Sequence, residues 1–152
     1  MRDAVQSYSE IPQGTWYEIA RLDNRFEKGM DNVSATYSRR DDGSIRVLNR
    51  GYDVAAKDWQ QVEGKAYFVD NPQTAYLKVS FFGPFYGGYT VFTLDNNYHY
   101  AFVAGNDHDY LWLLARSPAI SDEIKNDFVH KARAAGFNTD NLVWVNQTLP
   151  AL

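Results

Sequence analysis

The feature that most constrains the fold is a long series of short alternating segments, each ended by turn residues. The series opens at 14–21 (GTWYEIAR) and closes at 110–116 (YLWLLAR). Turn residues recur about every 10–14 positions between these two segments, a spacing typical of a meander, sandwich or barrel. Eight antiparallel strands in up-and-down order can close into a barrel whose interior is wide enough for one small apolar ligand. We therefore expect an all-β protein.

The expected strands alternate between apolar and polar residues over much of their length. We place them at about 14–22, 33–39, 45–52, 59–68, 75–81, 88–94, 98–104 and 110–116. In the fourth segment, Val62 and Gly64 alternate with Gln61 and Glu63, so that one face of the sheet is buried and the other is wet. The last two segments are apolar on both faces, which predicts that another element covers them from outside.

A helix over about 121–135 is the predicted cover. Ser121 is suited to cap its first turn, and Gly136 is suited to follow its last turn. The apolar side chains recur at helical spacing at Ile124, Phe128, Ala132 and Ala135. A short last strand is expected at about 142–145. With the barrel at about 14–116, the 152 residues then form a single domain.

Composition excludes several classes of function. The net charge is −4 and no basic run exists, so nucleic acid is not expected as a partner. The chain has no cysteine, which excludes disulfides, thiolate nucleophiles, cysteine metal sites and thioester anchors. The sequence contains no run of 18 consecutive apolar residues, so we expect no membrane-spanning helix. The N-terminus has no apolar signal region, and we expect that any signal or anchor segment of the precursor has been removed.

Four sequence blocks together resemble the lipocalin family. They are GTWYEIAR at 14–21, GKA at 64–66, KVSFFGPFYGGY at 78–89 and DYLW at 109–112. Within this family, the sequence over about residues 12–147 is similar to the bacterial lipocalins, which are of the outer-membrane lipoprotein and apolipoprotein D-like type. The resemblance implies an eight-stranded antiparallel up-and-down barrel with one helix packed outside and a short ninth strand. It also implies a fatty acid or a lysophospholipid as the ligand, and a location in the bacterial periplasm or outer membrane.

The resemblance assigns a structural role to five residues of the family motif. These are Gly14, Trp16, Asp95, Tyr98 and Arg116. Trp16 is expected to close the base of the barrel, with the Arg116 guanidinium packed across its indole in a cation–π contact. Relatives with a lipid anchor carry an N-terminal cysteine that this chain lacks. Membrane association would therefore depend on a removed N-terminal segment.

Antiparallel connectivity then separates the two ends of the barrel. The loops at about 23–32, 53–58, 82–88 and 105–109 should form the mouth, and the turns at 40–44, 70–73 and 95–97 the base. Alternation and position predict that the pocket is lined by Ala20, Leu22, Tyr37, Val47, Val62, Gly64, Ala66, Val79, Phe81, Phe85, Tyr86, Trp112 and Leu114. Glu18 shares this parity, so either a bulge turns it away or an inward cation or tyrosine pairs with it.

Positive side chains near the mouth are candidates for contact with the polar head of a lipid. They are Arg21, Arg25, Lys28, Arg50 and Lys57. Phe82, Phe85 and Tyr86 lie in an expected mouth loop and predict docking to a membrane surface or a homodimer.

No motif predicts catalysis. The three histidines, His99, His108 and His130, lack the spacing of a zinc site, and no serine hydrolase motif is present. We expect no catalytic residue, no metal and no cofactor. Two alternatives to a lipid carrier stay open at this point. One is an enzyme acting on a small apolar substrate in the barrel, and the other is an interaction protein with an incidental pocket.

Overall fold

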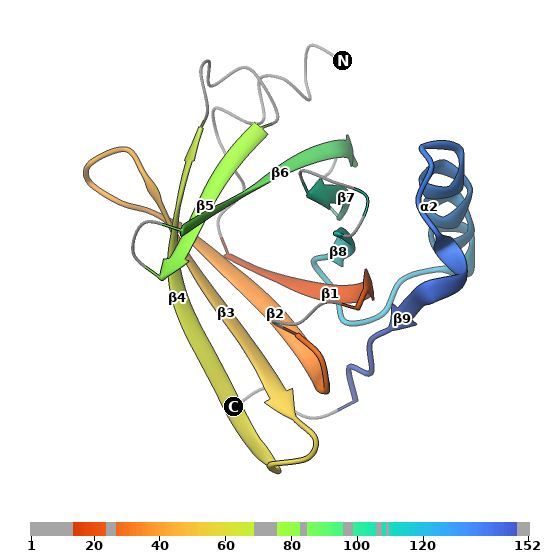
Figure 1. The fold of residues 1–152 in the computed structure, drawn as a ribbon, viewed down its shortest axis with the longest axis horizontal. Helices are drawn as coiled ribbons and strands as arrows, with labels where there is room; N and C mark the ends of the chain where they lie inside the picture. Colours follow the sequence, from red (N-terminus) through yellow and green to blue (C-terminus); the bar gives the residue numbers. More distant parts are fainter. Residues whose placement is uncertain are drawn as a thin grey trace.

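Nine strands and one α-helix make up the described part of the chain (Figure 1). The computed structural model describes residues 14–23, 27–68, 76–82, 85–95, 99–105, 108 and 110–148, and for 66–68, 76–82 and 85–94 it describes the backbone alone. The elements are β1 (Gly14–Leu22), β2 (Met30–Arg39), β3 (Ile45–Asp53), β4 (Asp58–Phe68), β5 (Tyr76–Phe82), β6 (Phe85–Leu94), β7 (Tyr100–Gly105), β8 (Leu111–Ala115), α2 (Asp122–Ala134), a 3-10 turn (Thr139–Asn141) and β9 (Leu142–Trp144).

The strands form an antiparallel meander in which each strand from β1 to β8 pairs with the next. Strand β1 also pairs with β8 along its other edge, and β9 pairs with the second half of β1. The predicted architecture of eight up-and-down strands, an external helix and a short ninth strand is confirmed. Several strand boundaries differ: β2 begins at Met30, earlier than expected, β5 extends to Phe82 and β6 begins at Phe85. Phe82, Phe85 and Tyr86 therefore belong to strands and not to a long loop.

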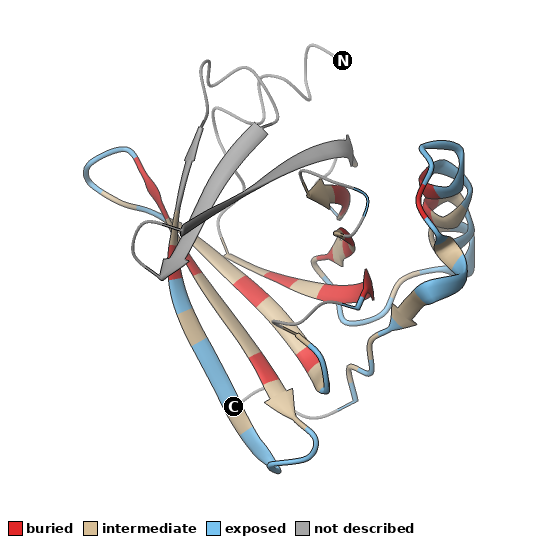
Figure 2. Ribbon diagram, in the orientation of Figure 1, coloured by how far each residue is buried: buried red, intermediate tan, exposed pale blue. Residues whose placement is uncertain are grey.

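Helix α2 covers one face of the sheet, which we call the outer face. The Ser121 hydroxyl accepts a hydrogen bond from the Ile124 N–H at 3.3 Å, and Gly136 has φ +96°, as expected at the two ends of the helix. Phe128 and Ala132 are fully buried against Phe102, Leu111, Leu113 and Ala115 of the sheet (Figure 2). Ala135 was expected to belong to the apolar face of the helix, but its side chain is exposed. It is the C-cap residue, which follows the last helical residue, Ala134.

A β-bulge in β1 divides its side chains between the two faces of the sheet. Glu18 pairs with Leu114, but the next pair is Ala20 with Leu113, so one extra residue is inserted between them. Because of this insertion, Ile19, Ala20 and Leu22 all pack in the cluster under α2. Ala20 and Leu22 were expected to line the pocket, and the structure corrects this: simple alternation fails at the bulge.

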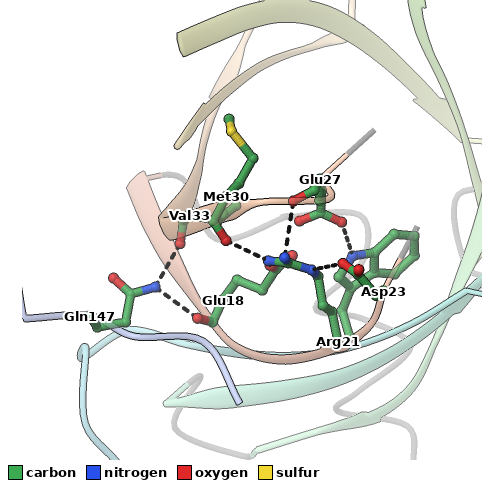
Figure 3. A network of polar contacts seen from close by, with 8 residues as sticks. Glu18, Arg21, Asp23, Glu27, Met30, Val33 and Gln147 are labelled. Atoms are coloured by element: carbon green, nitrogen blue, oxygen red, sulfur yellow. Dashed lines mark hydrogen bonds and ion pairs between the residues drawn. The ribbon is translucent and has the colours of Figure 1, made fainter. Parts of the chain in front are cut away.

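The C-terminal segment fills the seam between β1 and β2. These two strands pair directly only from Gly14–Tyr37 to Tyr17–Ser34, and β2 carries a second bulge after Asp31. Beyond that point the Val145 N–H donates to the Ile19 carbonyl at 2.9 Å. The Asn32 N–H donates to the Asn146 carbonyl at 2.8 Å. The Gln147 side-chain amide donates to the carbonyls of Glu18 at 2.7 Å and Val33 at 2.9 Å (Figure 3). One side chain thus joins the strands where their ladder is broken.

Replacement of this bridging amide has a predicted cost. Gln147→Ala leaves two part-buried carbonyls without their donor, and we expect the free energy of unfolding to fall by about 1–2 kcal/mol. The measurement is urea unfolding at an unchanged m-value. Thr148→Ala, at the next and exposed position, is the matched control and should change stability by less than about 0.5 kcal/mol. Equal effects of the two substitutions would show that the amide does not hold the seam.

Candidate functional site

The face of the sheet opposite α2 carries its own apolar cluster, and we call it the inner face. Trp16 of β1 and Ala101 and Val103 of β7 are buried together there, with Tyr37, Trp112 and Leu114 packed against them. Trp16 is 4% exposed and Val103 is 2% exposed. These aromatic and aliphatic side chains form an apolar surface with few polar groups, as is typical of sites that bind small apolar molecules.

Strand register extends this face across β3 and β4. Residues directly opposite one another in a sheet share a face. Tyr37 is opposite Val47, Val47 is opposite Gly64, and Val62 belongs to the same face of β4 as Gly64. Val47 is buried, and so is Gly64, which has no side chain to fill the space beside it. The structure therefore brings together on the inner face six of the predicted lining residues: Tyr37, Val47, Val62, Gly64, Trp112 and Leu114.

Five further predicted lining residues lie in the part of the sheet described by backbone alone. Ala66 is opposite Ile45 of β3 on one side and Val79 of β5 on the other. The side chains of Ala66, Val79, Phe81, Phe85 and Tyr86 lie outside the described part, so their role in a pocket stays a prediction. The same holds for the docking surface and the homodimer expected from Phe82, Phe85 and Tyr86.

The start of β1 and the residue after β8 meet in the predicted cation–π contact. The Arg116 guanidinium carbon lies 4.6 Å from the centre of the Trp16 ring, and its Nη1 donates to the Thr15 carbonyl at 3.2 Å. Gly14 has φ +106°, and a Cβ at this position would lie 3.0 Å from Arg116 Nη1. Glycine is therefore needed here both for its backbone conformation and for the close approach of the guanidinium. Burial lowers the pKa of Arg116 from its usual value.

Asp95 of the expected family motif contacts His99 and Tyr100 across the connection between β6 and β7. Its Oδ2 accepts from the His99 N–H and also lies 3.1 Å from the His99 ring nitrogen Nδ1. The Asp95 N–H donates to the Tyr100 carbonyl, which closes the turn. Tyr98 lies outside the described residues. Asp95 thus has a local structural role at this turn.

A buried polar network occupies the inner face near the β1–β2 loop (Figure 3). The Arg21 Nη1 donates to Glu18 Oε2 and to the Met30 carbonyl, both at 3.1 Å. Its Nη2 donates to the Glu27 carbonyl at 3.0 Å, and its Nε donates to Asp23 Oδ1 at 3.1 Å. Arg21 is 2% exposed, so this guanidinium ties the loop to β1 from inside.

Sequence reasoning left Glu18 open between a bulge that turns it away and an inward partner, and the structure shows the inward partner, Arg21. The bulge lies after Glu18, so Glu18 stays on the inner face with Leu114. The extra residue turns Arg21 to that same face, where it is opposite Trp112. Glu18 and Arg21, three positions apart, can meet only because of the bulge. Arg21 is therefore engaged with Glu18 and is not the free cation expected near the mouth.

Glu27 of the β1–β2 loop completes the network and was missed by the sequence analysis. Its Oε1 accepts a hydrogen bond from the Trp112 indole N–H at 2.9 Å, across 85 positions of sequence. Burial, together with the charge of Glu27 and a hydrogen bond to it, raises the pKa of Glu18 well above its usual value, against the opposing effect of Arg21. No periodic signal marks a single loop glutamate, so only the fold shows that Glu27 reaches the inner face.

The raised pKa of Glu18 predicts a pH dependence of stability. The folded protein keeps this proton at pH values where the unfolded chain has lost it. The resulting stabilisation is complete below the ordinary value of 4.5 and is lost as the pH rises through the folded pKa. We therefore expect the wild type to lose stability relative to Glu18→Gln above about pH 4.5, by up to about 1.4 kcal/mol per pH unit. Chemical denaturation of both proteins from pH 4 to pH 8 is the measurement, and parallel curves would contradict the shift.

The described residues contain neither a candidate metal site nor a helix that could span a membrane. Within the ranges given above, no group of three or more His, Asp or Glu side chains is arranged to hold a metal ion. No described helix combines the length and the apolar character needed to cross a membrane. The His99 side chain is 69% exposed, and the His108 Nε2 lies 3.0 Å from the Ala135 carbonyl at the end of α2.

The other positive side chains expected near the mouth are not part of this buried network. Arg50 stacks over Trp59 with its guanidinium carbon 4.2 Å from the ring centre. Strand register puts both residues on the face opposite to Val47 and Val62. Lys28 and Lys57 are exposed, and Arg25 lies outside the described residues.

Comparison with known proteins agrees with this architecture. The model of a family described as "Lipocalin-like domain" matches residues 9–147. The outer membrane lipoprotein Blc of Citrobacter freundii is 59% identical over 134 residues, covering 88% of this chain and 76% of the relative. Temperature-induced lipocalin-1 of Arabidopsis thaliana is 34% identical, covering 85% of this chain and 73% of the relative. The solved structure of lobster apocrustacyanin A1 shares the fold, with a TM-score of 0.74 at 17% identity over 98% of this chain and 88% of that one.

Proposed function

The chain belongs to the lipocalin family, and from this premise we propose that it binds a small lipophilic molecule against the inner face of its barrel. The observation that carries the proposal is the apolar cluster around Trp16, which faces away from α2 and continues through Tyr37 and Val47 to the side-chain-free position Gly64. A glycine and an alanine at successive inner positions of β4, 64 and 66, favour space for a ligand.

A single acyl chain is the ligand type that this face suits best. Each methylene group transferred from water contributes about 0.8 kcal/mol, so a chain of moderate length reaches micromolar affinity without any polar contact. Fatty acids and lysophospholipids are two natural classes with one such chain. We propose one of these as the cargo, with its tail toward Trp16 and its polar head toward the β1–β2 loop.

The proposed location is the bacterial cell envelope. The relatives of Citrobacter freundii, Escherichia coli and Vibrio cholerae, at 53–59% identity, are all named outer membrane lipoproteins. A carrier at the envelope would meet single-chain lipids released from the bilayer, and the proposed role is to bind and carry or store them.

The test is a titration of the lipid-free protein with oleate and, separately, with oleoyl lysophospholipid, followed by tryptophan fluorescence and calorimetry. We expect saturable binding at about one ligand per chain with micromolar or lower Kd. Gly64→Leu places a large side chain on the inner face between Val47 and the next strand, and we expect it to weaken binding at least about tenfold while the fold is retained. The matched control is Glu63→Leu on the opposite face. Absence of saturation with both lipids would overturn the proposal.

A further inference from the structure

Strand β4 extends further than its neighbour on one side. It pairs with β3 from Asp58 to Ala66, but with β5 only from Lys65 to Phe68. The β3–β4 hairpin therefore projects beyond β5 (Figure 1), and this part of β4 carries exposed residues (Figure 2). Among the described residues, no strand lies along the second edge of Asp58–Glu63. A segment of this length presents about 20 Å of open strand edge.

The backbone groups of alternate residues point toward this open edge. The Trp59 N–H donates to the Oδ1 of Asp58 in its own strand at 2.9 Å, as expected of a residue whose backbone groups point away from β3. Residues of an antiparallel strand alternate between its two edges, so Gln61 and Glu63 point the same way as Trp59. Asp58 thus caps the first N–H of the edge, and the N–H and carbonyl groups of Gln61 and Glu63 follow it.

The edge lacks several of the features by which proteins prevent strand addition. Exposed edges are commonly interrupted by a proline, a lysine or a bulge. The segment Asp58–Glu63 contains neither proline nor lysine, and its register with β3 is regular throughout. Gln60 and Gln61, near its centre, are exposed and uncharged. Such an edge suits an extended backbone, which it would bind through the hydrogen bonds of an ordinary sheet.

A second copy of this chain is a poor match for the edge. Residues directly opposite one another in an antiparallel pair share a face of the sheet. Pairing of two β4 edges about Gln61 would place Trp59 opposite Glu63 of the other copy. Pairing about Gln60 would place Trp59 opposite Gln61, and Val62 would meet a polar residue in both registers. Neither register matches two apolar side chains or two opposite charges, so the edge favours a different chain.

The side chains beside the edge define the chemistry of its partner. Trp59 lies on one face with Arg50 and Tyr52, Val62 lies on the other face, and Asp58 is exposed at the hairpin end. We propose that this edge binds an extended segment of another protein by strand addition, with an apolar residue opposite Trp59 and a lysine or arginine at Asp58. Backbone hydrogen bonds supply the affinity, and the flanking side chains supply the specificity. The inference is independent of the lipid site.

The probe is the peptide acetyl-Lys-Val-Thr-Val-Tyr-Lys-amide, titrated into the full, isotope-labelled chain and followed by the amide resonances of the protein. Antiparallel to β4, it places its tyrosine opposite Trp59 and its last lysine opposite Asp58. We expect saturable shifts of the Gln61 and Glu63 amides, with a Kd of about 100 μM or lower. Methylation of the threonine nitrogen, which donates to Gln61 in this register, should weaken binding about tenfold. Methylation of the next valine nitrogen, which points away from β4, should weaken it by less than about twofold.

Substitution of one edge residue tests the same contact from the protein side. Gln61→Pro removes the N–H that points to the open edge, where proline is tolerated, and should weaken binding about tenfold. Gln61→Thr keeps this N–H and should bind within about twofold of the wild type. If Gln61→Pro does not fold, the two methylated peptides still test the contact on the wild type.

Three results would overturn the proposal. The first is the absence of amide shifts at about 1 mM peptide. The second is an equal loss of affinity for the two methylated peptides, because binding would then not depend on the backbone bonds of the edge. The third is a dimer of the free chain that Gln61→Pro dissociates, because the edge would then belong to a second copy.

Discussion

Phe128→Ala is expected to lower the free energy of unfolding by about 3–5 kcal/mol, because it removes a large side chain packed between α2 and the sheet. Phe128 is fully buried, and its ring meets Phe102 of β7 edge-on with centres 5.1 Å apart. The alanine leaves a cavity that two rigid elements cannot close. In a domain of this size the midpoint of thermal unfolding should fall by roughly 10 °C.

Two further substitutions test whether packing is the cause. Phe128→Leu keeps an apolar side chain and should cost about 1–2 kcal/mol. His130→Ala, at an exposed position two residues later in the same helix, should change stability by less than about 0.5 kcal/mol. Denaturant unfolding of the three variants provides the comparison. A loss below 1 kcal/mol for Phe128→Ala would mean that α2 is not part of the cooperative core.

Arg21→Met has the second large expected effect, also about 3–5 kcal/mol at a pH where Glu18 is ionised, because it then breaks a buried ion pair from one side. Glu18 loses its opposing charge, and the carbonyls of Met30 and Glu27 lose their donor. The β1–β2 loop should then detach from β1, which hydrogen exchange of the Met30 N–H can detect through the loss of its bond to the Glu27 carbonyl.

A double variant distinguishes the charge from the packing of this site. Glu18→Leu combined with Arg21→Met replaces both charges with apolar groups, and we expect it to be more stable than Arg21→Met alone by at least about 1 kcal/mol. Arg50→Met is the matched control, since Arg50 stacks on Trp59 at the opposite face and should contribute about 1 kcal/mol or less. If the single and double variants were equally unstable, the ion pair would not be the reason for the loss.

The architecture was predictable because its signals are local and repeated. Alternation fixes the face of each residue along an unbroken strand, and Ser121 and Gly136 mark the ends of α2 by capping chemistry alone. The facing of Ala20 and Leu22 was predicted wrongly because a single inserted residue, at Ile19, exchanges the two faces from that point onward. Nothing in the local sequence marks that insertion.

The polar part of the site depends on contacts that are distant in sequence. Glu27 and Trp112 are 85 positions apart, and the loop that carries Glu27 has no periodicity. Gln147 closes the seam between β1 and β2 only because both strands are bulged at the same level. A buried carboxylate such as Glu18 could be recognised as needing a partner, but the identity of that partner, Arg21, followed from the three-dimensional structure.

We propose that the inner face of this lipocalin holds one single-chain lipid, and native mass spectrometry of the purified protein can detect that lipid. The bound material is released into organic solvent and identified, and the lipid-free protein is measured again after addition of excess oleate or oleoyl lysophospholipid. We expect a mass increase corresponding to about one lipid per chain, which extraction removes and renewed addition of lipid restores. A protein mass that carries no lipid and does not shift with either addition would contradict it.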